Sequence, residues 1–465
     1  MFPMFKTKFR IIGKPAKVIF MTLPALLVLV FLSTGAAEKN PQDLSSKIDE
    51  YMNAAMKLRW FSGSVLVAEG GKILASKGYG MANYELDVPN SPQTKFRLGS
   101  DTKQFTAMAI MQLQEQGKLK AEDPIKKFLP DFPNGETITI HHLLTHTSGI
   151  PSFTEFPDYV STMALPSPVE KTVERFKNKP LEFAPGEKYN YSNSGYILLG
   201  YLIEKISGKS YEAFLKENIF DPLQMKDSGY DHSTDVLKNR AAGYELSGGE
   251  IYNASYIDMT IPHAGGALYS TVEDLYKWDR ALYTEKLVKK SALEKIFTPF
   301  KNNYAYGWLI GAFKGHKSIS HDGGINGFTT NIARYVNDDA CVVVLNNFGT
   351  AFTGKISQDL AAILFGEKYE LPKKKKIAQV DPKVTDDFIG KYQGPMGLLV
   401  VTKEGRRLFV EIEGRQKFEV FPESETRFFL EIAEIEISFV KDDKGKVSQL
   451  ILHYGGQDIP AKKIE

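Results

Sequence analysis

Two polar residues, Ser100 and Lys103, stand at the start of an otherwise apolar stretch, "FRLGSDTKQFTAMAIMQLQEQGK". The apolar pattern predicts a buried helix, on which residues three apart share a face, so the hydroxyl and the amine can meet. Burial lowers the pKa of a lysine, and a helix N-terminus stabilises an anion. The pair therefore suits acyl transfer, which needs a nucleophile, a base and anion stabilisation. The alternative is a helix-capping serine followed by a lysine that reaches solvent.

The pattern Ser-x-x-Lys occurs a second time, in Ser438 and Lys441 of "EISFVKDDKGK". That segment is typical of a strand, in which residues three apart point to opposite faces. The second pair cannot cooperate, so only the first is a candidate site.

Two further motifs follow the first pair along the chain. Tyr191-Ser192-Asn193 precedes another apolar helical pattern, and His321-Asp322-Gly323 ends a predicted strand. Together with "TITIHHLLTHTSGIPSF", these motifs resemble, in order and spacing, the serine β-lactamase-like family of class C β-lactamases, penicillin-binding peptidases and related esterases. The resemblance covers roughly residues 48–365.

The resemblance implies a role for each matching position. Ser100 would be the acylated nucleophile, and Lys103 would help to deprotonate it. Tyr191 would act as general base or proton shuttle, if nearby cations favour its phenolate. Asn193 would hydrogen-bond the substrate amide or Lys103. "HLLTHTSG" would frame the site without taking part in the chemistry.

The third motif would border the substrate. The resemblance implies that His321 and Gly323 contact it, and that the backbone N–H groups of Ser100 and Gly324 form the oxyanion hole. The sequence has histidine where β-lactamases and many penicillin-binding proteins have the lysine of Lys-Thr-Gly. A histidine is mostly neutral at pH 7 and gains a proton near pH 6, so it offers a substrate carboxylate no permanent charge. The difference favours esters, or amides and peptides without that carboxylate, over efficient β-lactam hydrolysis.

The elements that must position these residues follow from the apolar pattern. We expect a helix near 43–58, a hairpin turning at Gly70-Gly71, a largely helical stretch over 100–293, four short strands between 304 and 347, and a helix that stops at Gly366. The fold class is therefore α+β, with an antiparallel sheet made by both ends of the domain, flanked by helices and interrupted by a helical insert. The resemblance identifies it as β-lactamase/transpeptidase-like.

A hydrolase domain is predicted over 41–368, followed by a linker at 369–382 that contains four consecutive lysines between two prolines. Residues 383–465 alternate apolar and polar side chains in short segments, which predicts a small all-β, barrel-like domain.

The first 37 residues combine five basic side chains, an apolar run and the small residues Gly35-Ala36-Ala37. This composition is typical of an export signal. An uncleaved membrane anchor is the alternative, because residues 18–37 nearly suffice to span a bilayer. With either interpretation the folded part is periplasmic or extracellular, associated with the membrane or cell envelope only through its N-terminus.

The composition limits the classes of binding partner to be expected. A formal net charge of +2 and the lack of an Arg-rich stripe give no indication of nucleic-acid binding. The single cysteine, Cys341, cannot form an internal disulfide, and no spacing indicates a metal or other cofactor. We therefore expect a small-molecule or peptide substrate.

The sequence predicts an exported serine hydrolase that forms an acyl-enzyme on an ester or amide. The enzymatic alternatives are a penicillin-binding peptidase acting on D-amino-acid or cell-wall peptides, and a weak β-lactamase. The non-enzymatic alternative is a binding protein that keeps the fold without turnover.

Overall fold

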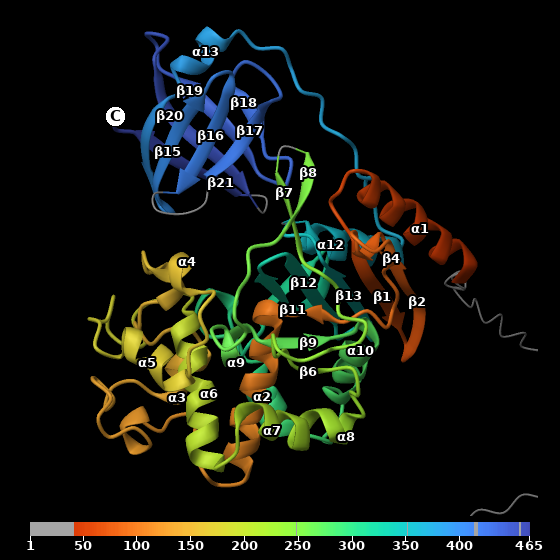
Figure 1. Cartoon of the computed structure of the whole chain (residues 1–465), viewed down its shortest axis with the longest axis vertical. Helices are drawn as coiled ribbons and strands as arrows, with labels where there is room; N and C mark the ends of the chain where they lie inside the picture. Colours follow the sequence, from red (N-terminus) through yellow and green to blue (C-terminus); the bar gives the residue numbers. More distant parts are fainter. Residues whose placement is uncertain (1–40, 248, 351, 413–416, 455–456) are drawn as a thin grey trace, which may run out of the picture. The chain divides into compact units, whose positions relative to one another are not determined.

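The computed structural model describes residues 41–247, 249–350, 352–412, 417–454 and 457–465 (Figure 1). The predicted export signal or anchor at 1–37 lies outside these residues. None of the helices in the described ranges is long and apolar enough to cross a membrane.

A six-stranded antiparallel sheet forms the centre of the first domain, with the strand order β10-β11-β12-β13-β1-β2. Its strands are β1 (Gly63–Glu69), β2 (Lys72–Tyr79), β10 (Leu309–Phe313), β11 (His316–Ile325), β12 (Phe328–Tyr335) and β13 (Ala340–Asn346). The predicted hairpin is confirmed, because Gly70 and Gly71 join β1 to β2 with φ values of 59° and 73°, as a tight hairpin turn requires. The sheet thus joins both ends of the domain, as expected (Figure 1).

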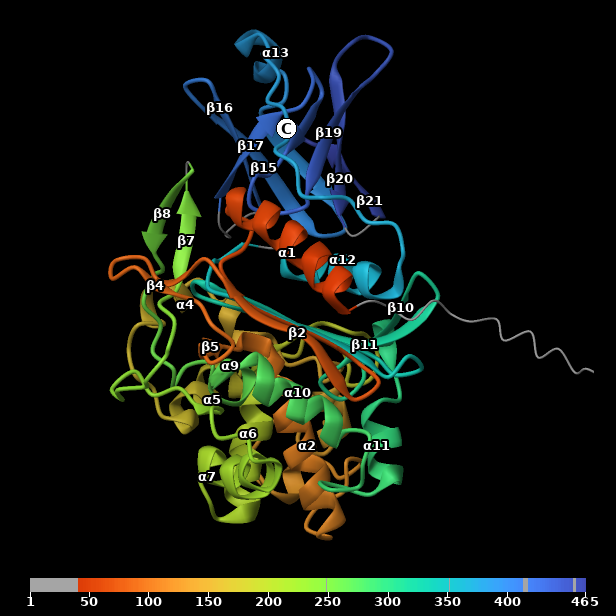
Figure 2. The same cartoon turned by 90° about the vertical axis from the view of Figure 1, so that its right-hand side faces the viewer.

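Helices cover both faces of this sheet (Figure 2). The helices α1 (Pro41–Lys57) and α12 (Thr353–Phe365) pack on one face, around an apolar cluster that includes Val65, Val67 and Val344. The helices α2 (Thr102–Glu115) and α10 (Val272–Ala281) belong to the larger cluster on the other face. Because β1 and β13 are buried almost throughout, their sequences are nearly continuous apolar runs. The predicted closing helix ends at Gly366, which adopts the left-handed conformation.

Helices separated by long loops are the main regular structure between β2 and β10, in line with the predicted helical insert. Its other α-helices are α3 (Ile140–Leu144), α4 (Tyr159–Thr162), α5 (Val169–Lys177), α6 (Asn193–Ser207), α7 (Tyr211–Leu215), α8 (Asp221–Leu223), α9 (His263–Gly266) and α11 (Lys290–Ile296). The sequence did not predict its short strands, which are β3 (Met81–Asn83), β4 (Val88–Pro89), β5 (Phe96–Arg97), β6 (Gly229–Tyr230), β7 (Tyr244–Ser247), β8 (Glu250–Asn253) and β9 (Leu268–Ser270). The pairing of β5 and β6 with β9 joins distant segments, whereas β3 with β4 and β7 with β8 are local pairs. Strands of two to four residues carry too little pattern to be recognised.

The C-terminal part is a closed antiparallel barrel, which confirms the predicted barrel-like β-domain. A short helix, α13 (Pro382–Asp386), precedes it; the strands are β14 (Gly390–Gly394), β15 (Gly397–Glu404), β16 (Arg407–Ile412), β17 (Lys417–Pro422), β18 (Arg427–Phe429), β19 (Glu436–Lys441), β20 (Val447–Tyr454) and β21 (Gln457–Lys463). Apolar side chains such as Leu450 and Phe439 fill the interior.

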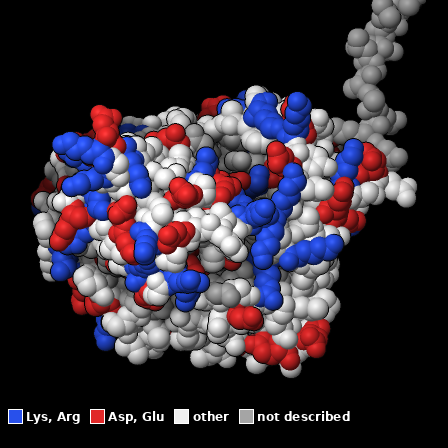
Figure 3. Space-filling model, turned by 90° about the horizontal axis from the view of Figure 1, so that it is seen from above, with Lys and Arg blue, Asp and Glu red and all other residues white. Residues whose placement is uncertain are grey.

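Figure 3 shows one face of the whole molecule, on which basic and acidic side chains are interspersed, so neither sign of charge dominates this face.

Candidate active site

Ser100 lies in a single 3₁₀ turn, η1 (Gly99–Asp101), that leads directly into α2. The turn passes very close to the sheet at Gly99, which has a φ of +54°. A Cβ at that position would lie 2.7 Å from the backbone nitrogen of Gly324. Only glycine fits such a conformation and approach, so the glycine before Ser100 holds the turn against β11.

Lys103 follows in the first turn of α2, and its side chain is completely buried. The alternative of a lysine that reaches solvent is therefore wrong. Its Nζ lies 2.9 Å from the Ser100 Oγ, 2.9 Å from the Asn193 Oδ1 and 2.8 Å from the carbonyl oxygen of Gly265 in α9. Burial lowers the pKa of Lys103 to about 7, although the nearby Asp101 opposes this effect.

Tyr191 precedes α6, and its hydroxyl donates a hydrogen bond of 2.8 Å to the Ser100 Oγ. Burial raises the pKa of the Tyr191 phenol far above its ordinary range, although the hydrogen bond with Ser100 opposes this rise. Burial thus disfavours a Tyr191 phenolate and leaves the role of proton shuttle.

Asn193 is the first residue of α6, while Ser192 occupies the N-cap position. The amide nitrogen Nδ2 of Asn193 donates to the Thr154 hydroxyl at 3.1 Å, which directs the Asn193 Oδ1 towards Lys103. The structure thus brings Ser100, Lys103, Tyr191 and Asn193 together, although up to 93 positions separate them in the chain.

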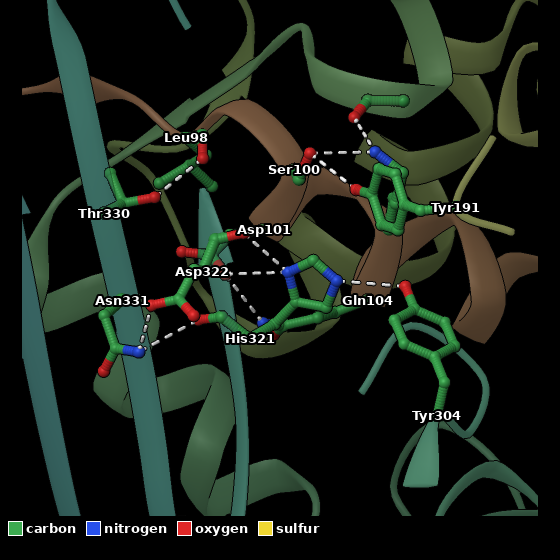
Figure 4. Close-up of polar contacts among 12 residues, drawn as sticks. Leu98, Ser100, Asp101, Gln104, Tyr191, Tyr304, His321, Asp322, Thr330 and Asn331 are labelled. Carbon is green, nitrogen blue, oxygen red and sulfur yellow. Dashed lines mark hydrogen bonds and ion pairs between the residues drawn. The ribbon is translucent and has the colours of Figure 1, made fainter. Parts of the chain in front are cut away.

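His321 does not lie as the sequence predicted. Only 4% of its surface is exposed, and both ring nitrogens already have partners (Figure 4). The Nδ1 is 2.7 Å from the carbonyl oxygen of Asp322, so it carries the proton, and the Nε2 accepts from the Tyr304 hydroxyl at 3.0 Å. Burial and the nearby Lys103 lower the pKa of His321 to about 3. The burial of the ring and its two partners argue against the expected hydrogen bond to substrate and against protonation near pH 6.

The two glycines of the third motif lie against the turn that carries Ser100. A Cβ at Gly323 would lie 1.9 Å from the carbonyl oxygen of Leu98, so this position requires close backbone contact. The Gly324 nitrogen borders Gly99, next to Ser100. These positions suit the predicted substrate and oxyanion contacts.

His146 is a site residue that the sequence reasoning missed. It is buried, has a left-handed φ of 56°, and its ring centroid lies 4.2 Å from that of Tyr191. Its carbonyl oxygen accepts from the Asn190 N–H at 3.0 Å, and its Nδ1 accepts from the Ser192 N–H at 3.1 Å. His146 therefore holds the backbone on both sides of Tyr191. The motif "HLLTHTSG" contains His146, but its residue types give no indication of this contact.

The second Ser-x-x-Lys pair behaves as the strand pattern predicted. The Ser438 Oγ lies 2.8 Å from the His453 Nε2, while the Lys441 Nζ lies 3.7 Å from a carboxylate oxygen of Asp387. Within the described ranges, no group of three histidine, cysteine or acidic residues is arranged to hold a metal ion.

Comparisons with known proteins identify the family of the chain. The Beta-lactamase family model matches residues 45–363, and a model described as a domain of unknown function (DUF3471) matches residues 374–463. Penicillin-binding protein 4* of Bacillus subtilis is 33% identical over 428 residues, which cover 86% of this chain and 94% of that protein. The chain therefore belongs to the β-lactamase and penicillin-binding protein family of serine hydrolases.

Solved structures show the same fold. The octameric penicillin-binding protein homologue from Pyrococcus abyssi is 29% identical, with a TM-score of 0.63 and coverage of 90% of this chain and 99% of that chain. The penicillin-binding protein from Bacillus halodurans is 30% identical, with a TM-score of 0.60 and coverage of 68% of this chain and 98% of that chain. The predicted β-lactamase/transpeptidase-like fold is thus confirmed.

Proposed function

We propose that this protein hydrolyses an ester or amide substrate through an acyl-enzyme on Ser100. The three hydrogen-bond partners of the Lys103 amine support the proposal. A neutral amine has two N–H groups, and two of its three partners, the Gly265 carbonyl and the Asn193 Oδ1, can only accept. The lone pair of the neutral amine is then directed at the third partner, the Ser100 hydroxyl.

The proposed acylation step follows from these contacts. The Ser100 Oγ attacks the substrate carbonyl carbon while its proton moves to the Lys103 Nζ. The N–H groups of Ser100 and Gly324 stabilise the negative oxygen of the tetrahedral intermediate. When the bond to the leaving group breaks, Tyr191 gives the leaving oxygen or nitrogen its proton and regains one from Lys103. A water molecule then attacks the acyl carbon and gives a proton to Lys103. When the bond to the Ser100 Oγ breaks, Lys103 returns this proton to the Oγ, and the acid is released.

The alternative substrate is a D-amino-acid or cell-wall peptide. It is supported by the name of the Bacillus subtilis relative, a penicillin-binding protein that aligns with most of this chain. A chromogenic penicillin and a D-amino-acid peptide therefore belong in the substrate screen beside short-chain esters.

The domain limits and the export of the protein also remain proposals. We propose a hydrolase domain at 41–368, a linker at 369–382 and a barrel domain at 383–465. The basic and apolar composition of residues 1–37 supports an exported, periplasmic or extracellular protein. The N-terminal sequence of the protein recovered from its producing cell would distinguish a cleaved signal from an anchor.

Covalent labelling tests the proposed nucleophile. A fluorophosphonate probe should attach to Ser100, and Ser100→Ala should abolish both labelling and turnover. Ser438→Ala is the matched control, because Ser438 begins the other Ser-x-x-Lys pattern, and it should change neither result. Labelling that persists in Ser100→Ala would refute the assignment, and a wild type that is neither labelled nor active would support a binding protein.

A further inference from the structure

The carbonyl group that holds Lys103 belongs to a strained segment. Gly265 lies in α9, which is a single helical turn of four residues. The first of them, His263, has a φ of 33°, a backbone conformation that residues other than glycine rarely adopt. Such strain persists only when the surrounding structure holds the segment in place. The contact between Gly265 and Lys103 therefore depends on the groups that fix α9.

Side chains of α2 make hydrogen bonds that fix α9. Thr106, one turn beyond Lys103 on the same face of α2, donates its hydroxyl hydrogen to the Ala264 carbonyl oxygen at 2.7 Å. Lys103 donates to the adjacent carbonyl, that of Gly265, at 2.8 Å. These two carbonyls lie at the end of a short helix, where the helix has no further turn whose N–H groups could bond to them. The side chains of α2 take the place of that missing turn.

A second residue, Tyr211, fixes the direction of the Thr106 hydroxyl. The oxygens of the two hydroxyl groups are 2.6 Å apart. Because the Ala264 carbonyl can only accept, Thr106 gives its hydrogen to that carbonyl, and Tyr211 donates to Thr106. The Thr102 carbonyl, 3.4 Å from the Thr106 oxygen, is the more distant acceptor. The Tyr211 N–H donates to the Glu204 carboxylate at 2.9 Å, so Tyr211 is held through both its backbone and its side chain.

Burial makes this chain of hydrogen bonds important for the position of α9. Thr106, Tyr211 and Ala264 are all completely buried. An unpaired carbonyl in such an interior is much less favourable than one that is hydrogen-bonded or in water. Without the Thr106 hydroxyl, the Ala264 carbonyl stays unpaired unless α9 moves to find another donor.

We propose that Thr106 and Tyr211 are positioning residues of the acylation step. They hold α9 so that the Gly265 carbonyl keeps the lone pair of the neutral Lys103 amine directed at Ser100. The inference rests on the proposed hydrolase function and adds to it two residues that belong to none of the three sequence motifs. A displacement of about 1 Å at a catalytic group lowers a rate by up to about a hundredfold, so a modest shift of α9 has a measurable effect.

Thr106→Val tests the proposal, because it removes the hydroxyl and keeps the branched shape of the side chain. We expect the rate of Ser100 acylation by the neutral fluorophosphonate, measured between pH 5.5 and 9, to fall at least about tenfold on its alkaline plateau. The midpoint of the rise should also move below the wild-type value. A carbonyl accepts more strongly from an ammonium than from a neutral amine, so a weaker Gly265 contact favours the neutral form of Lys103. Thr106→Ser, which restores the hydroxyl, should restore both the plateau and the midpoint.

Tyr211→Phe tests the same chain of hydrogen bonds from its other end. It keeps the Thr106 hydroxyl but removes the donor that directs it, so we expect a fall of about threefold to tenfold and a midpoint shift in the same direction. In a Thr106→Val background the tyrosine has no hydroxyl to direct, so adding Tyr211→Phe should lower the rate little further. If Thr106→Val shows no cooperative thermal transition and is thus unfolded, Tyr211→Phe decides the test, and an unchanged rate in Tyr211→Phe overturns the inference.

Thr172→Val in α5 is the matched control. Thr172 is also a buried threonine, and its hydroxyl donates to the Ser167 oxygen at 3.1 Å, outside α2 and α9. This variant loses a comparable hydrogen bond and should keep the wild-type plateau and midpoint.

Three results would overturn the inference alone: an unchanged plateau in Thr106→Val, a lower plateau whose midpoint does not move, or a failure of Thr106→Ser to restore the rate. An equal fall in Thr172→Val would also overturn it, because the effect would then follow from lost stability. If the wild type is not labelled at Ser100, the proposed function fails and the inference fails with it.

Discussion

The burial of Lys103 predicts how the rate of Ser100 acylation depends on pH. The proposed step needs the neutral amine, and the pKa of Lys103 is lowered to about 7. The neutral fraction then rises from about one tenth at pH 6 to about nine tenths at pH 8. A solvated lysine, with a pKa of about 10.4, would be neutral only to a small extent at both values, and its neutral fraction would rise about a hundredfold over the interval. The structure therefore predicts about a tenfold rise that levels off.

The rate of Ser100 acylation by a neutral fluorophosphonate, measured between pH 5.5 and 9, tests this prediction. The two histidines and the tyrosine of the site do not produce such a limb. Burial lowers the pKa of His321 to about 3 and that of His146 well below its usual value, and it raises that of Tyr191 far above the interval. Burial also raises the pKa of the Asp101 carboxyl, so a midpoint near pH 7 is assigned to Lys103 when Asp101→Asn retains it.

Two results would contradict the predicted titration of Lys103. A rate that rises a hundredfold from pH 6 to pH 8 without levelling off would mean that Lys103 behaves as a solvated lysine. A limb near pH 7 that remains in the residual activity of Lys103→Ala would assign the titration to another group. A control reaction with free hydroxide must be subtracted at each pH.

Three further predictions concern the cost of burying Lys103, the role of His146 and the independent folding of the hydrolase domain. The unfolded chain binds a proton to Lys103 with a pKa near 10.5 and the folded chain only near 7, so burial costs about 5 kcal/mol below pH 7 and nothing above pH 10.5. Lys103→Met should therefore inactivate the enzyme. It should also raise the unfolding free energy at pH 6 by about 2–4 kcal/mol in denaturant titrations, because about 1–3 of the 5 kcal/mol is lost at the acceptors left unpaired; a destabilised variant would contradict this. His146→Ala should slow acylation at least about tenfold, whereas His146→Asn, which tolerates the left-handed backbone and keeps an acceptor, should retain more activity; an equal loss in a Tyr191→Phe background would show that His146 does not act through Tyr191. Truncation after Pro372 should leave a folded hydrolase domain with a cooperative thermal transition, and an insoluble product would show that the barrel completes its core.

The sequence predicted those features that depend on local patterns. Alternating apolar residues around Gly70-Gly71 indicated the hairpin, and the apolar run after Lys103 indicated the buried helix, because each pattern extends over many neighbouring residues. The spacing of Ser100 and Lys103 on one helix likewise requires only local geometry. Their proximity to Tyr191 and Asn193 was expected from the resemblance to a known family.

The tertiary structure decided which charge each side chain carries. The Gly265 carbonyl that binds Lys103 is 162 positions away in the chain, and its sequence, "HAGG", contains no sign of the contact. His321 was expected to face the substrate, but the Tyr304 hydroxyl and the burial of the ring keep it neutral and inaccessible. A pKa depends on desolvation and on neighbours from several segments, so it cannot be derived from one motif.

The difference between what the sequence determines and what the tertiary structure decides is clearest at the third motif. By themselves, the residues His321, Asp322 and Gly323 determine a strand with an unusual pair of polar side chains and a glycine that permits close approach. Which of the two polar side chains is buried and which is exposed is decided by the register of β11 against β12 and by the point at which β10 stops pairing. Strand alternation sends neighbouring side chains to opposite faces, and only the packed fold determines which face buries its side chain at this point of the strand.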